Sequence, residues 1–83
     1  MIKFEYTVTD EVGIHARPAG MLVNKVKSVG VPVTVEKGGK TADASKLFAI
    51  MALAVKHGDT VTVTVDGDET AAGEIEEFFK SHL

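Results

Sequence analysis

The sequence contains no cysteine, and this absence excludes disulfides, thiolate metal sites and cysteine nucleophiles. The three histidines, His15, His57 and His82, are scattered along the chain and have no carboxylate cluster beside them, so they do not indicate a metal site. We therefore expect neither a metal nor a cofactor.

Long apolar runs and clusters of basic residues are also missing. No apolar stretch approaches the ~18 residues that cross a membrane, and segment 1–5 alternates in polarity where a signal peptide has an apolar block. We therefore expect a cytoplasmic protein with no membrane partner. The formal net charge is −3 at pH 7, which argues against a nucleic-acid partner.

The short length limits the kinds of chemistry that the chain can support. Its 83 residues are enough for one domain, which we take as residues 1–83. A chain of this size buries only about 60% of its unfolded surface on folding. Because this leaves little room for an enclosed pocket, a small-molecule-binding domain is disfavoured, and so is an enzyme that engulfs its substrate.

Hydrophobic periodicity predicts four strands and three helices. Alternating polarity indicates the strands, at 2–8, 31–36, 41–43 and 60–66. Apolar residues at helical spacing indicate helices from 16 to about 30, from 46 to 55 with Ser45 as N-cap, and after 68. The order βαββαβα with one-sided strands predicts an α+β fold, an antiparallel sheet covered by helices on one face.

Residues 13–19, Gly-Ile-His-Ala-Arg-Pro-Ala, place His15 at the N-terminus of the first predicted helix. Unpaired N–H groups and the positive end of the helix dipole favour an anion there, and they disfavour imidazolium, so one ring nitrogen can attack. Arg17, the only arginine, has a planar guanidinium suited to phosphate oxygens. Since Pro18 has no N–H, the donors available are those of Ala16, Arg17 and Ala19. The motif alone also fits a histidine that merely caps the helix or lies on the surface.

The predicted helix 46–55 is apolar around its whole circumference. One half of the helical wheel suffices to cover the sheet, and it comprises Ala49, Ile50, Leu53 and Ala54. The other half of the wheel is not needed to cover the sheet, and we expect it to be exposed. It comprises Leu47, Phe48, Met51, Ala52 and Val55. An exposed patch with Met and Phe suits a docking surface that accommodates several partners. Coverage by another helix or by a second copy of the chain is the alternative.

The motif at 13–19 closely resembles that of the HPr family, the histidine-containing phosphocarriers of the bacterial phosphoenolpyruvate:sugar phosphotransferase system. The similarity spans the full length and continues in 39–41, 47–51 and 60–67. It implies an open-faced β-sandwich, with four antiparallel strands and three helices on one side. It also implies that His15 takes a phosphoryl group on Nδ1 from phosphorylated enzyme I, assisted by Arg17, and passes it to the A domain of a sugar-specific enzyme II. Such a protein is a covalent carrier rather than an enzyme.

The resemblance also implies where partners dock. The family's partner surface corresponds here to Ala16, Arg17, Gly20, Leu47, Phe48, Met51 and Ala52, which agrees with the second half of the helical wheel. Because this surface must stay free, we expect a monomer. Two alternatives stay open: a regulatory paralogue that acts by binding other proteins, and a carrier of the nitrogen-related branch of the phosphotransferase system.

Two positions depart from the family pattern. Many relatives have Lys-Ser where this chain has Ser45-Lys46, and that serine is the regulatory phosphorylation site in some bacteria. Lys46 occupies the position of the serine, and Ser45 lies about 100° away around the helix start, so we expect serine-based regulation to be absent or altered. At position 20 relatives more often carry a residue larger than the Gly20 of this chain. A glycine inside a helix costs about 1 kcal/mol of helix stability relative to alanine.

Overall fold

Four strands and three helices follow one another in the predicted order βαββαβα. The structure, a computed structural model, describes residues 1–83. The strands are β1 (Ile2–Thr7), β2 (Val33–Lys37), β3 (Lys40–Asp43) and β4 (Thr60–Val65). The helices are α1 (Ala16–Val29), α2 (Leu47–Ala52) and α3 (Glu69–His82). None of the helices combines the length and the hydrophobicity that crossing a membrane requires.

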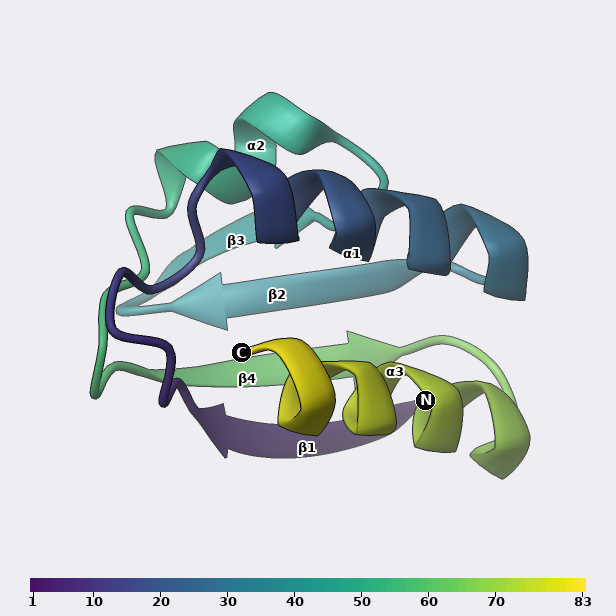
Figure 1. The fold of residues 1–83 in the computed structure, drawn as a ribbon. Helices are drawn as coiled ribbons and strands as arrows, with labels where there is room; N and C mark the ends of the chain where they lie inside the picture. Colours follow the sequence, from purple (N-terminus) through teal and green to yellow (C-terminus); the bar gives the residue numbers. More distant parts are fainter.

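The strands form one antiparallel sheet in the order β1-β4-β2-β3, and the helices cover one of its faces (Figure 1). The central strand β4 pairs with both neighbours, and its Val63 lies opposite Phe4 on one side and Val35 on the other. Every second residue of β4 is buried under the helices, whereas its threonines lie on the half-exposed face. This one-sided burial confirms the α+β open-faced sandwich.

The hydrophobic core lies between the sheet and the helices. Phe79 of α3 is fully buried, and its ring contacts Phe4 and Tyr6 of β1 edge to face, with centroids 5.8 and 5.6 Å apart. Leu22 of α1 and Ile50 of α2 are buried as completely. Helix α1 packs against both other helices. These contacts in the core hold the helix in place and so fix the direction in which its N-terminus points.

Helix α2 differs from its prediction at both ends. Its N-cap is Lys46 rather than Ser45, because the Ser45 hydroxyl donates instead to Asp43 Oδ1 at 2.7 Å. It ends at Ala52 rather than at 55, because Ala54 adopts a positive φ of 52° and turns the chain away. Val55 therefore leaves the helical wheel and is buried, 3% exposed, where an exposed position was predicted. Ala54, placed on the buried half by the wheel, is exposed.

Strand β2 begins at Val33, two residues later than predicted. Pro32 is exposed and has no N–H to donate to the neighbouring strand, although its carbonyl accepts the N–H of Asp66 at 2.9 Å.

Helix α3 begins as expected after the turn that follows β4, and the side chain of its N-cap Asp68 accepts the N–H of Ala71 at 2.9 Å.

Candidate functional site

His15 is the N-cap residue of α1, with extended backbone angles of φ −107° and ψ −174°. Its carbonyl accepts the first intrahelical hydrogen bond, from the N–H of Ala19 at 2.9 Å, whereas its side chain makes no capping hydrogen bond. The residue is exposed. The imidazole thus lies at the positive end of a helix of 14 residues and is open to the surface. This geometry excludes the interpretation that the ring serves as a helix cap.

The backbone just before His15 packs tightly against the chain that follows α2. Gly13 has φ +84°, and a Cβ at this position would lie 2.2 Å from the carbonyl oxygen of Val55. The N–H of Ile14 donates to that same oxygen at 3.0 Å. Only glycine satisfies both the positive φ and the close approach. The first residue of the motif, Gly13, therefore allows the backbone that leads to His15 to pack against Val55.

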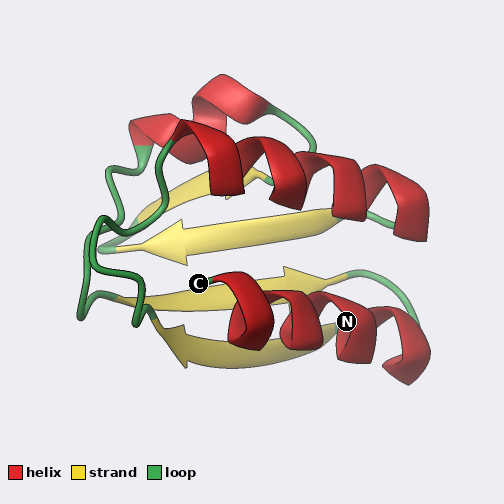
Figure 2. Ribbon diagram, viewed as in Figure 1, coloured by secondary structure: helices red, strands yellow, loops and turns green.

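The rest of the loop between β1 and α1 is bound at its other end. Val8 and residues 58–59 exchange two backbone hydrogen bonds, at 2.8 and 2.9 Å. The N–H groups of Thr9 and Asp10 both donate to the carbonyl of Leu83, at 2.7 and 2.8 Å. Figure 2 shows this loop and the α2–β4 loop together at one end of the sheet. The segment that carries His15 is therefore supported by two parts of the chain that are distant in sequence.

Ala16 and Arg17 form the first two positions of α1, and both are exposed. Neither of the chain's two salt bridges involves Arg17, so its guanidinium is not engaged by a carboxylate. The prediction that the N–H of Ala19 is available was wrong, because it is the donor to the His15 carbonyl. The backbone donors that remain beside the imidazole are those of Ala16 and Arg17.

Helix α2 presents part of its apolar surface to solvent. Phe48 is 83% exposed and Met51 38% exposed, Ala52 is also exposed, and Leu47 is half-buried. Ile50 is fully buried on the opposite side. The wheel therefore placed Ile50, Phe48 and Met51 correctly, whereas Ala49 and Leu47, which it assigned to opposite halves, are both half-buried.

Two residues of α1, Gly20 and Met21, are also partly or fully accessible. Gly20 is half-buried on α1, which packs directly against α2. Met21 beside it is 38% exposed. The exposure of Met21 was not predicted; the signal that could have indicated it is its place outside the apolar stripe of α1 that Ala19, Leu22, Val23 and Val26 form.

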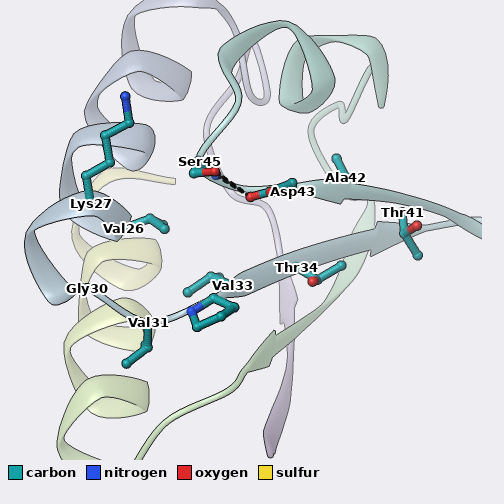
Figure 3. Close-up of a pocket in the computed structure, with 11 residues that line it drawn as sticks. Val26, Lys27, Gly30, Val31, Val33, Thr34, Thr41, Ala42, Asp43 and Ser45 are labelled. Atoms are coloured by element: carbon teal, nitrogen blue, oxygen red, sulfur yellow. Dashed lines mark hydrogen bonds between the residues drawn. The ribbon is translucent and has the colours of Figure 1, made fainter.

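Ser45, two residues before Leu47, lines a groove of about 590 Å³ at the C-terminal end of α1. The groove lies between α1, β2 and β3, and the Ser45 hydroxyl points toward Asp43 rather than into solvent (Figure 3). Both the hydroxyl and the N–H of Ser45 donate to Asp43 Oδ1, and they lower the pKa of that carboxyl. Lys46 is exposed at the start of α2.

Comparison with known proteins identifies the family. A family model described as the PTS HPr component phosphorylation site matches residues 2–81. The chain belongs to the HPr family. HPr proteins are phosphocarriers of the phosphotransferase system, and the resemblance seen in the sequence is thereby confirmed.

Individual HPr proteins are similar in both sequence and fold. The phosphocarrier protein HPr of Mycoplasma capricolum is 33% identical over 69 residues, which cover 83% of this chain and 78% of that protein. A Mycoplasma histidine-containing phosphocarrier protein superposes with a TM-score of 0.89 at 29% identity, over 96% of this chain and 93% of its own. Crh of Bacillus subtilis, described as a swapped dimer, has a TM-score of 0.76 at 27% identity, over 100% and 98% of the two chains.

Proposed function

We propose that this HPr-family protein accepts a phosphoryl group on His15 from phosphorylated enzyme I, in the cytoplasm, and passes it to the A domain of a sugar-specific enzyme II. The observation that carries the proposal is the exposed His15 side chain at the N-terminus of α1, which makes no capping hydrogen bond. A nucleophile that must meet two different proteins has to be reachable, and this one is.

The chemistry is an in-line displacement at phosphorus. A lone pair on the neutral imidazole, by family resemblance on Nδ1, forms the new P–N bond while the bond from phosphorus to the phosphorylated group of enzyme I breaks. The electron pair of the breaking bond returns to that group of enzyme I, and the phosphoryl group keeps its two negative charges. The N–H groups of Ala16 and Arg17, in the first turn of α1, and the Arg17 guanidinium are the groups that we expect to stabilise the transferred dianion.

The site suits a carrier better than an enzyme with a substrate of its own. The largest concave surface is the groove at the C-terminal end of α1, at the other end of the helix from His15. The groups proposed to hold the phosphoryl group, the N–H groups of Ala16 and Arg17 and the Arg17 guanidinium, come from a single helical turn. We expect each partner protein to supply the remaining catalytic groups. Transfer in both directions then depends on docking.

The apolar surface on α2 and α1 is the proposed docking site. It combines Ala16, Arg17, Gly20, Leu47, Phe48, Met51 and Ala52, and we add Met21. Phe48 is the natural anchor, because a large aromatic side chain with 83% exposure gains the most from burial in a partner. A monomer keeps this surface free, whereas a swapped dimer like that described for Crh is the competing state.

Regulation through Ser45 is not part of the proposed function. Its hydroxyl is committed to Asp43, and a phosphoryl group there would place a second anion beside an ionised carboxylate. Lys46 stands at the family's serine position. Exchanging the two residues to Lys-Ser is the direct test, since the exchanged protein should become a substrate of the regulatory kinase.

Incubation with phosphoenolpyruvate and enzyme I, followed by intact-mass measurement, tests the relay. We expect the mass to rise by one phosphoryl group, which is labile in acid, is lost in His15→Ala and is retained in the matched controls His57→Ala and His82→Ala. Addition of an enzyme II A domain should then remove the group. An unchanged mass with an active enzyme I would contradict the proposal and favour a regulatory binding protein.

A further inference from the structure

Lys37, at the end of β2, binds the α2–β4 loop at two points. Its Nζ donates to the carbonyl of Ala54 at 2.8 Å and lies 2.9 Å from Asp59 Oδ2. The same carboxylate oxygen accepts the N–H of Lys56 at 2.8 Å. We call these four residues the latch. It closes the loop from both ends, and its ion pair is only partly exposed, at 29% and 32% for the two side chains.

The loop that the latch closes is the surface on which the His15 segment packs. Between Ala54 and Lys56 lies Val55, whose carbonyl accepts the N–H of Ile14, the residue before His15. At the other end of the loop, the carbonyl of Asp59 accepts the N–H of Val8. Lys37 is thus separated from the imidazole by two hydrogen bonds and a few peptide units, although the two residues come from different elements.

The loop needs such a support because its backbone is not in a relaxed conformation. Ala54 has φ +52°, and among the non-glycine residues it is the only one with a positive φ. A Cβ makes this conformation unfavourable, so it persists only where the surroundings impose it. The bond from Lys37 to the Ala54 carbonyl is such a constraint, and it acts on the peptide unit that leads directly to Val55.

We propose that Lys37 and Asp59 are positioning residues for phosphoryl transfer, which orient His15 by fixing the loop against which Gly13 and Ile14 pack. This inference rests on the proposed function, because it assigns a role in the reaction of His15. Neither residue touches the imidazole. Their removal should leave partner binding intact and lower the rate of the chemical step, since a small misplacement of a reacting group slows it strongly.

The chain offers a matched control for Lys37. Its other salt bridge joins Lys25 of α1 to Glu74 of α3 at 3.2 Å, with 31% and 49% exposure, and contacts neither loop. We therefore compare Lys37→Met with Lys25→Met. Each variant removes one partly exposed ammonium group and keeps most of the side chain's apolar part.

Hydrogen exchange of the Ile14 amide tests the structural half without any partner protein. We expect Lys37→Met and Asp59→Asn to accelerate this exchange about 10-fold relative to the amides of β4, and Lys25→Met to leave it unchanged. Unchanged exchange in Lys37→Met would overturn the proposal. Equal acceleration at all amides would also overturn it, because the latch would then stabilise the whole fold rather than this loop.

Transfer kinetics test the functional half. With phosphorylated enzyme I, Lys37→Met should lower kcat about 10-fold at unchanged KM, and Lys37→Arg, which can donate to both acceptors, should restore it. An unchanged kcat, or a rise in KM alone, would overturn the positioning role. If the unaltered protein takes up no phosphoryl group, the proposed function fails and the role in transfer fails with it, whereas the exchange result still decides whether the latch orders the loop.

Discussion

Gly13 lies against Val55 so closely that any side chain at position 13 would collide with the Val55 carbonyl. A Cβ would stand 2.2 Å from that oxygen and 2.7 Å from the Cα of Lys56, and the residue also has φ +84°. Both neighbours are backbone atoms, which cannot rotate away as a flexible side chain can. The contact joins the loop before His15 to the loop after α2, which are about 40 residues apart along the chain.

Gly13→Ala should therefore destabilise the protein by about 3 kcal/mol, from the positive φ together with the collision. The midpoint of urea unfolding measures this loss. The variant should also accept phosphoryl groups more slowly, because the backbone before His15 has to move. Wild-type stability in this variant would show that the two loops are not in close contact.

Gly20→Ala should have the opposite effect. Gly20 is in the interior of α1, and a Cβ built there meets no other atom within 4 Å. Since alanine is favoured over glycine inside a helix, we expect a gain of about 1 kcal/mol in the free energy of unfolding. Urea unfolding of the two glycine variants in parallel provides the comparison, and a loss of stability in Gly20→Ala would contradict the open space seen here.

Ala54→Gly should relieve the one unfavourable backbone conformation outside the glycines. The positive φ costs about 1–2 kcal/mol with a Cβ present, and the greater freedom of glycine in the unfolded chain offsets part of the relief. We expect a net gain of about 0.5–1 kcal/mol in thermal unfolding experiments. The control Ala49→Gly, inside α2, should instead lose about 1 kcal/mol. Equal losses in both variants would argue against the conformation described for Ala54.

The stability of the fold should decrease in acid partly through two aspartates. The Ser45 hydroxyl and N–H lower the pKa of Asp43, and hydrogen bonds from Lys37 and the Lys56 N–H lower that of Asp59. Because each pKa is lower in the folded state, the stabilisation is complete above the ordinary aspartate pKa of about 3.9 and is lost as the pH falls through the folded value.

Replacement of both aspartates by asparagine should flatten this acid dependence. The measurement is the urea midpoint at a series of pH values from about 5 down to about 2. The variant should be less stable than the parent at the upper end and should approach it at the lower end. Parallel curves for the two proteins would contradict the lowered pKa values.

Phe48→Ala should weaken docking without affecting the fold. Because the residue is 83% exposed, its truncation removes little of the core, so the melting temperature should stay within about a degree or two of the parent. If Phe48 anchors the partner surface, KM for transfer from enzyme I should rise about 10-fold or more while kcat changes little. Glu77→Ala, at an exposed position on α3, serves as the control. A KM equal to that of the control would place the docking surface elsewhere.

Periodicity in the sequence alone was sufficient for the order of the elements, the antiparallel sheet covered on one face, and the place of His15 at the start of α1. These features depend on contacts within a few residues, such as the alternation in β4 or the change to helical spacing after Pro18. The motif of residues 13–19 was local as well, which is why the family resemblance was evident.

Only the tertiary structure shows the contacts between segments that are far apart in the sequence, because hydrophobic periodicity reports on neighbouring residues alone. The sequence did not reveal that Ala54 would end the helical path and that Val55 would be buried. Nor did it reveal that Lys37 would meet Asp59, since this pair forms only once the sheet order places β2 beside β4. The position of His15, the residue proposed to carry the chemistry, is therefore determined by its own segment, whereas its support comes from groups that only the folded chain brings together.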